Sequence, residues 1–528
     1  MINFYKSNFL YSFLIFIISI SINQYFGFIG INPLDNFTIY NSGFLILNNQ
    51  IPFNDFWVIT GPLLDYFQAI FFKLFGLNWS AYVLHASVFN FLFSIIIFFS
   101  LLKFGLNKKL SFFYSCLTAF IFYPTVGTPF VDHHAIFFSI TSILIFLLAI
   151  NFKNKIFWVL LPIILGLGFF SKQTPTAYFI ILIGLSALYY FAINKDYTNL
   201  IFAFLSTVVF LLLTFLFFYI QNINLQFFYE QYIQFASSVG AERIESGSFL
   251  KPYSFSRYVL KFKLIHLSYL SLFVLAAWKF FKVKNYHLTV EFITLLSLIL
   301  TAYILVYHQL LTLNSKFIYC IIPLMFGFSN IYLEKYLKKK NRKFITLIIL
   351  LTFCASIYNF HKYVYKRNFI APYFSEKKEG EAFKTKIIDK VTELKWFSNL
   401  DNSPENEISN LKKTINELIL IQKKNNEKFV LITDYQFIFS SYGLKNAVFI
   451  NKLYGNGISY PSVNNPNFKI YKKYFLSKIK NNNVKNIYII KPSWFNEHNN
   501  ALKNIFKTGC EKTIVNKNLL VINIKNCY

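Results

Sequence analysis

Charged residues are scarce in this chain. Only 14% of its 528 residues are charged, and Asp and Glu together number 23, whereas an average soluble domain is about 25% charged. Hydrophobic residues make up 55% of the sequence, and Phe alone contributes 68 residues. Apolar runs of about 20 residues recur, each long enough to cross a bilayer core of about 30 Å. This composition excludes a wholly water-soluble protein.

Motifs of several soluble enzyme classes are also missing after residue 362. That region has no Gly-rich phosphate loop, no Cys/His zinc spacing and no nucleophile elbow. The net charge of +29 is not arranged as a basic stripe interleaved with surface aromatics, and much of it falls in loops between apolar runs. We therefore exclude nucleic-acid binding. No small-residue cleavage site follows the first apolar run, so we expect that run to be retained.

Eleven apolar runs predict a polytopic α-helical membrane protein with about eleven spans. They lie at 9–28, 81–102, 110–123, 134–150, 156–170, 175–193, 200–220, 264–281, 290–307, 317–333 and 344–360. Lys and Arg collect in alternate loops, for example Lys108 and Lys109, whereas 124–132 has none. Because positively charged loops stay in the cytoplasm, we expect a cytoplasmic N-terminus in the inner membrane and an extracytoplasmic C-terminus.

Composition divides the chain into a transmembrane domain, 1–361, and an extracytoplasmic soluble domain, 362–528. Short β-like runs at 429–433 and 486–490 alternate with helix-compatible sequence at 376–424 and 500–506, which predicts a small α/β domain. Cys510 and Cys527 flank two strand-like runs. A terminal hairpin would bring them together, and an oxidising compartment would let them form a disulfide; two unrelated thiols are the alternative.

The first outer loop, 29–80, is too long and too apolar for a simple connector. Phe37, Tyr40, Phe44 and Leu47 recur at helical spacing, which predicts a helix lying in the membrane interface. Asp35 comes about seven residues after the first span, so we expect it at the membrane surface.

Three further charged residues lie at the same expected level. Asp132 opens the fourth span, Lys172 lies between the fifth and sixth, and Lys316 opens the tenth, just after His308. Ionisable groups near bilayer depth usually face a protein cavity. Two carboxylates and two ammonium groups around one cavity would suit a phosphate-bearing substrate and a base. The alternatives are helix capping by the acids and snorkelling by the lysines.

These residues resemble motifs of the GT-C superfamily of membrane glycosyltransferases, and especially the families of protein mannosyltransferases and lipid A aminoarabinose transferases. Asp35, Ile51-Pro-Phe-Asn-Asp55, Gly61-Pro-Leu-Leu-Asp-Tyr66 and Phe75-Gly76 follow the order of the first-loop motifs. Ser171-Lys-Gln-Thr174 matches the Lys motif, and Lys316 begins a segment similar to the Arg/Lys-Tyr-x-x-Pro motif. The likeness covers roughly residues 1–335. Asn36 stands where the family has a second acid, which weakens any metal-binding role.

The resemblance implies transfer of a sugar from a polyprenyl-phosphate carrier to a lipid, glycan or protein acceptor outside the cytoplasm. Asp35 would be the general base and Asp132 would assist it. The substrate-binding residues expected are Lys172, Lys316, Asp55, His133, His308, Arg243 and Arg257, the last two on a loop, 221–263, that would close over the donor. We assign no cofactor, and a divalent metal is the open alternative. A transporter or flippase of lipid-linked sugars is the rival reading, and a non-catalytic assembly subunit is a third.

Overall fold

The computed structural model describes residues 2–32, 35–243, 255–312, 316–336, 342–369, 379–381, 395–397, 404–425, 427–442, 444, 446–455, 457–490, 502–506, 510–516, 518–525 and 527. Contacts divide the chain into two compact units. The helical unit comprises Met1–Gly27, Val83–Leu216 and Arg243–Pro372. The α/β unit comprises Phe28–Tyr82, Phe217–Glu242 and Tyr373–Tyr528. Each unit is therefore assembled from three separate stretches of sequence.

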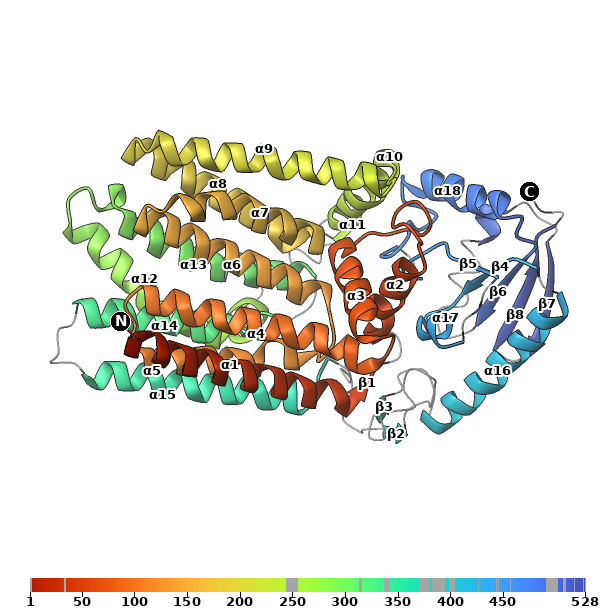
Figure 1. Cartoon of the computed structure of the whole chain (residues 1–528), viewed down its shortest axis with the longest axis horizontal. Coiled ribbons are helices and arrows are strands. Elements are labelled where there is room, and N and C mark those ends of the chain that lie inside the picture. Colours follow the sequence, from red (N-terminus) through yellow and green to blue (C-terminus); the bar gives the residue numbers. More distant parts are fainter. Residues whose placement is uncertain are drawn as a thin grey trace. The chain divides into compact units, whose positions relative to one another are not determined.

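A long helix forms at each of the eleven predicted apolar runs (Figure 1). These helices are α1 (Ile2–Ile29), α4 (Trp79–Lys103), α5 (Lys108–Ile121), α6 (Val131–Phe152), α7 (Lys155–Ser171), α8 (Gln173–Asn194), α9 (Tyr197–Ile220), α12 (Lys263–Lys282), α13 (Val290–Leu311), α14 (Ile321–Tyr336) and α15 (Arg342–Asn359). Within the described residues, 8 helical spans are long and apolar enough to cross a membrane. Helices α5, α7 and α14 are shorter, with 14, 17 and 16 residues. The chain is thus a multi-pass membrane protein, and the count of eleven spans stays a prediction.

Burial separates the central helices of the helical unit from the peripheral ones. The span of α6 is 83% buried, and it packs against α7, α8 and α13. The span of α9 is equally apolar but only 6% buried. A helix that is hydrophobic all round belongs in a protein interior or in lipid. Helix α6 is thus the core of the helical unit, and α9 offers its side chains to lipid.

The first outer loop folds into the α/β unit as the short helix η1 (Asp35–Phe37), α2 (Thr38–Leu47) and α3 (Pro62–Phe75). Phe37 and Tyr40 are fully buried, and the ring of Tyr40 lies 4.7 Å from that of Phe72. The expectation that this apolar face lies in the membrane interface is therefore wrong for Phe37 and Tyr40. A helix with the same spacing buries its stripe equally well against protein, and here α2 packs on α3.

A five-stranded sheet organises the C-terminal part of the α/β unit. Its order is β5 (Ala447–Val448), β4 (Phe429–Ile432), β6 (Asn486–Ile490), β8 (Leu519–Asn523) and β7 (Glu511–Asn516). Strand β4 is parallel to β5 and β6, and β8 is antiparallel to β6 and β7. All four residues of β4 are buried, as expected when both faces of a parallel strand are covered. Three helices accompany the sheet: α16 (Pro404–Asn425), α17 (Phe437–Tyr442) and α18 (Phe468–Asn481). The predicted α/β fold of this region is confirmed.

A second, small sheet lies where the sequence suggested only helix. Strand β3 (Lys395–Phe397) pairs in parallel with β1 (Gly30–Ile31) and antiparallel with β2 (Glu379–Glu381). Within the described part of 376–424, the helical prediction is confirmed for α16 and wrong for 379–381 and 395–397, which are strands; the rest of that stretch lies outside the described residues. At Gly30 a Cβ atom would lie 2.1 Å from the ring of Phe397, so only glycine allows this close approach.

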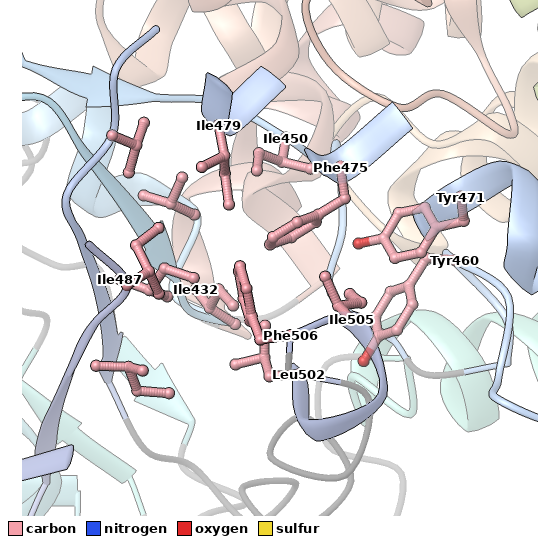
Figure 2. Packing of buried hydrophobic residues seen from close by; sticks show 14 of the residues in the cluster. Ile432, Ile450, Tyr460, Tyr471, Phe475, Ile479, Ile487, Leu502, Ile505 and Phe506 are labelled. Atoms are coloured by element: carbon pink, nitrogen blue, oxygen red, sulfur yellow. The ribbon is translucent and has the colours of Figure 1, made fainter. Parts of the chain in front are cut away.

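One hydrophobic core joins distant stretches of the α/β unit. Ile432, Ile487, Ile479 and Phe475 pack together (Figure 2), and the same cluster includes Trp57 from the first outer loop. The backbone N–H of Trp57 donates to the carbonyl of Ile450 at 2.7 Å, and the N–H of Lys452 donates to Trp57 at 2.9 Å. Residues 28–82 are therefore part of this unit's core. A domain boundary near residue 362 stays a prediction from composition.

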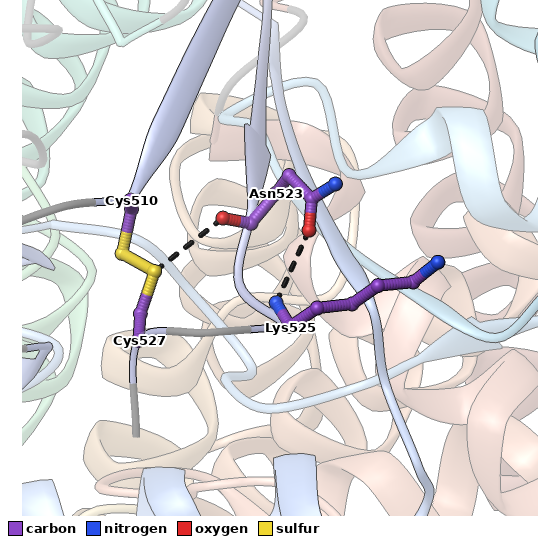
Figure 3. The surroundings of a disulfide bond; sticks show 4 residues. All are labelled: Cys510, Asn523, Lys525 and Cys527. Atoms are coloured by element: carbon purple, nitrogen blue, oxygen red, sulfur yellow. Dashed lines mark hydrogen bonds between the residues drawn. A yellow bond between two sulfur atoms is a disulfide. The ribbon is translucent and has the colours of Figure 1, made fainter.

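A disulfide joins Cys510 and Cys527 next to the terminal hairpin of β7 and β8 (Figure 3). Their Cα atoms are 5.5 Å apart, within the usual range for a disulfide. The side chain of Asn523 accepts the N–H of Lys525 at 3.1 Å, which shapes the turn that returns the chain to Cys510. Cys116, Cys320 and Cys354 are free and lie in or near helices of the helical unit.

Candidate functional site

Asp132, Lys172 and His308 form a buried cluster in the helical unit. The ammonium group of Lys172 donates to Oδ1 of Asp132 at 2.7 Å. Nε2 of His308 lies 3.4 Å from the same oxygen. The side chains of Asp132 and His308 are 3% and 1% exposed, whereas that of Lys172 is 15% exposed. The structure thus brings together three of the residues that the sequence predicted for one site.

Local backbone geometry places each member of this cluster. Asp132 occupies the first turn of α6, where the helix dipole favours a negative charge. Lys172 is extended, with φ −165° and ψ 137°, between the end of α7 and the start of α8. His308 lies in the last turn of α13. Because α6 and α13 both pack against α8, these helix ends meet.

The cluster can hold an anion and a proton. A lysine ammonium has three N–H donors, so Lys172 can bind Asp132 and still donate to an incoming phosphate. Oδ1 of Asp132 already accepts from Lys172 and lies beside the imidazole of His308. The carboxylate is therefore a weak base, but it holds both side chains in position. This arrangement favours anchoring of Lys172 by Asp132 over a direct role for Asp132 as base.

His133 is buried beside this cluster, but its ring serves the backbone. Nε2 of His133 lies 3.1 Å from the carbonyl oxygen of Phe122, and the ring packs against Phe317 at 5.0 Å. Nδ1 of His133 has no hydrogen-bond partner among the described residues, so one nitrogen is left for a ligand. A substrate-binding role for His133 stays a prediction.

Two more histidines continue this buried polar layer. Nε2 of His134 lies 3.1 Å from Nε2 of His85, and its Nδ1 contacts the hydroxyl of Tyr123. No group of three or more His, Cys, Asp or Glu side chains able to hold a metal occurs in the part of the chain that the structure describes.

Lys316 directly precedes Phe317, whose ring packs against that of His133. Its ammonium donates to the backbone carbonyl of Asn368 at 2.7 Å and lies 6.0 Å from the ring centre of Phe369. Phe369 packs against Phe130, two residues before Asp132. The structure therefore holds Lys316 with the segment that leads into α6.

Arg243 and Arg257 occupy different surroundings. Arg243 ends α11 (Ala236–Arg243). Arg257 is exposed on the π-helical turn η6 (Ser256–Leu260). Part of the predicted closing loop, 244–254, lies outside the described residues, so closure stays a prediction.

Asp35 and Asp55 belong to the α/β unit. Asp35 begins η1, and its side chain lies outside the described set. Its neighbour Asn36 is buried: its side-chain oxygen accepts the N–H of Asn32 at 2.7 Å, and its carbonyl accepts the hydroxyl of Tyr82 at 2.6 Å. Asn36 thus closes the turn that carries Asp35.

Asp55 is held on both sides. Its Oδ2 accepts the N–H of Ile51 at 2.8 Å, and its Oδ1 lies 3.1 Å from the ammonium of Lys478 on α18. A substrate-binding role for Asp55 stays a prediction.

Sequence analysis missed the partner of a second buried acid, Asp65. Lys452 donates to both oxygens of Asp65 at 2.7 Å, and Ser42 donates to Oδ1 at 2.5 Å. Burial raises the pKa of Asp65 and Lys452 opposes that shift, while burial lowers the pKa of Lys452. The only signal in the sequence is a lone lysine in the apolar stretch 447–454.

Arg367 was also missed. Its guanidinium donates to the carbonyls of Pro124 and Val126 at 2.8 and 3.2 Å. Burial lowers the pKa of Arg367 to about 9. Arg367 therefore fixes the turn η2 (Tyr123–Thr125), which leads toward Asp132.

Residues 60–220 match a family model described as dolichyl-phosphate-mannose-protein mannosyltransferase. An oligosaccharyltransferase from Archaeoglobus fulgidus is similar in structure, with a TM-score of 0.50, 14% identity, and coverage of 92% of this chain and 69% of that one. ArnT from Cupriavidus metallidurans, solved with undecaprenyl phosphate, has a TM-score of 0.45, 10% identity, and coverage of 98% of each chain. No curated protein matches the sequence. The likeness to the oligosaccharyltransferase shows a shared fold.

Proposed function

We propose that this chain, a GT-C membrane glycosyltransferase, transfers a sugar from a polyprenyl-phosphate carrier to an acceptor outside the cytoplasm. The observation that carries the proposal is the Asp132–Lys172–His308 cluster. Asp132 and Lys172 both lie within residues 60–220, the part matched by the mannosyltransferase family model. That family's description names a lipid-phosphate-linked sugar, and a partly exposed ammonium tethered at the helix ends suits such a phosphate.

The chain's residues would share the reaction as follows. A carboxylate, Asp35, takes the proton of the acceptor hydroxyl as the acceptor oxygen attacks the anomeric carbon. The bond between that carbon and the phosphate oxygen breaks, and its electron pair leaves with the carrier phosphate. Lys172 and Lys316 stabilise the growing negative charge, where a low dielectric strengthens the attraction. Asp132 and His308 position Lys172.

Two features support the proposed location in the cell envelope. A disulfide such as Cys510–Cys527 persists in oxidising compartments and is rare in the cytosol. The alternation of basic loops also favours a cytoplasmic N-terminus. Eleven spans in the inner membrane would then make the C-terminal region extracytoplasmic, as we propose. The acceptor (lipid, glycan or protein) then meets the enzyme on that side.

The decisive experiment incubates the purified protein with a panel of polyprenyl-phosphate sugars and a mixture of envelope acceptors. We expect release of the free carrier phosphate, measured by chromatography of the lipid products, with at least one sugar. Asp35→Asn in the same preparation is the matched control. Movement of intact lipid-linked sugar across vesicles, without release of the carrier, would instead identify a transporter.

A further inference from the structure

The α/β unit contains a polar cavity of about 260 Å³ that lies apart from the Asp132 cluster in sequence and has no assigned ligand. Its lining includes Gln50, Asp55, Lys428, Phe449, Lys478 and Asn482. Most ligand pockets are largely apolar and measure about 300–1,000 Å³. This cavity is smaller and mainly polar, so it suits one hydroxyl-rich unit rather than a lipid chain or a drug-like molecule.

Four parts of the α/β unit build the walls, one of them the stretch 446–449 around β5. Gln50 and Asp55 follow α2, Lys428 immediately precedes β4, and Lys478 and Asn482 lie at the end of α18. The segment carrying Asp55 is rigid. Asp55 donates its backbone N–H to Ile51 at 2.8 Å and accepts the N–H of Ile51 on its carboxylate at 2.8 Å. The cavity is therefore formed before any ligand arrives.

The charges of the lining leave a positive surplus. Asp55 is paired with Lys478 at 3.1 Å. Lys428 instead donates to the side-chain oxygen of Asn482 at 3.2 Å, which is an uncharged partner. Two lysines and one aspartate line the cavity, so its charge favours a ligand with one negative group.

The remaining lining fits a carbohydrate. The amides of Gln50 and Asn482 offer both donors and acceptors, and the half-buried ring of Phe449 offers an apolar surface. Sugar rings present hydroxyls along their edges and C–H groups on their faces, so they need both kinds of contact. An inorganic anion would leave the ring and the acceptor oxygens of the amides unused.

We propose that this cavity binds one negatively charged sugar unit of the acceptor. That the bound sugar belongs to the acceptor rests on the proposed transfer reaction. That the cavity binds a charged sugar does not depend on that reaction. The first outer loop contributes Asp55, so the segment that resembles the transferase motif also holds part of this site.

Binding is measured on the full-length protein in lipid nanodiscs, without any donor. The probes are glucuronic acid, glucose, glucose 6-phosphate and inorganic phosphate. Their binding is detected by ligand-observed NMR. A hydrogen bond to a charged group adds roughly tenfold in affinity. We expect glucuronic acid and glucose 6-phosphate to bind about tenfold more tightly than glucose, and more tightly than phosphate.

The variant that tests the assignment is Lys428→Gln; Lys428 is exposed, and replacing an exposed side chain usually changes stability little. We expect it to bring the affinity for glucuronic acid down to that for glucose. Lys473→Gln is the matched control, since Lys473 is exposed on α18 and does not line the cavity. Equal binding by both variants would overturn the proposal, as would phosphate binding as tightly as glucose 6-phosphate. Sugar binding that depends on Lys428, without carrier release, would retain the site and reject the transfer reaction.

Discussion

Among the described residues, each unit of this protein holds a Lys–Asp pair with a buried carboxylate, and the two pairs differ in how many hydrogen bonds the lysine makes. Asp65 and Asp132 both lie in the first turn of a helix. Lys452 binds both oxygens of Asp65 and also the carbonyl of Thr60, and its side chain is 3% exposed. Lys172 reaches one oxygen of Asp132 and is 15% exposed. A pair with every bond made holds the fold, whereas a pair with spare donors is available to a substrate.

The largest expected effect breaks the satisfied pair. Lys452→Met leaves the carboxylate of Asp65 buried without its cation, which destabilises a protein by about 3–5 kcal/mol. Unfolding is followed by tryptophan fluorescence, because Trp57 is buried in the same core. Lys473→Met, at an exposed position on α18, is the control and should change little.

The double variant Asp65→Leu with Lys452→Met sharpens this result. Replacing both ions by apolar groups removes the unpaired charge, so most of the lost stability should return. A single variant as stable as the wild type would show that the pair does not hold the α/β unit together.

The second effect concerns the Cys510–Cys527 disulfide of the α/β unit. The disulfide closes a stretch with a sequence separation of 17, and restricting an unfolded loop of that size stabilises by about 3 kcal/mol. Cys510→Ser with Cys527→Ser should lower the unfolding midpoint accordingly. Reductant should lower the midpoint of the wild type but not that of the double variant; insensitivity of both would mean that the thiols are not bonded.

The third effect concerns the rate of the proposed transfer reaction. Asp35→Asn keeps the size of the side chain but removes the base, so transfer should fall by about 10²-fold or more. Donor binding and the unfolding midpoint should stay close to those of the wild type. Rates are measured as carrier release under single-turnover conditions. Full transfer by Asp35→Asn, with none by Asp132→Asn, would reassign the base while keeping the reaction class.

The smallest effect tests the pair with spare donors. Lys172→Ala should weaken donor binding by about tenfold, since one charge-assisted hydrogen bond to phosphate is lost. Its stability should fall less than that of Lys452→Met, because Asp132 keeps His308 nearby. Lys172→Arg retains the positive charge and should recover much of the binding, which equilibrium titration of the donor would detect. A larger loss of stability than for Lys452→Met would remove the distinction between the two pairs.

The helical unit was largely predictable because lipid imposes a simple rule on sequence. Each long apolar run became a helix, and the runs' ends fell within four residues of the observed ones, except that α1 begins seven residues before its run. The rule also located Asp132 and Lys172, since a charge at the end of an apolar run stands out. His308 was found in the same way, beside Lys316 at the start of the next run.

The α/β unit was less predictable because its contacts join residues far apart in sequence. Periodicity marked β4, β6 and the terminal hairpin, but nothing local indicates that Trp57 shares backbone hydrogen bonds with Ile450 and Lys452. The pairing of β1 with β3 also leaves no periodic pattern in the sequence, since each strand has three residues or fewer. Lys452 was missed for the same reason: its partner Asp65 lies 387 residues away.

The first outer loop shares a core with the C-terminal region, so it is synthesised well before the residues that it packs against. Thr60 and Lys452 are separated by 392 residues, and a ribosome adds about 5–20 residues per second. The first outer loop therefore spends roughly 20–80 s outside the ribosome before its partner exists. During that interval Trp57 and Phe37 lack the side chains that finally bury them. Until residue 452 has been synthesised, the apolar side chains of this loop lack that cover.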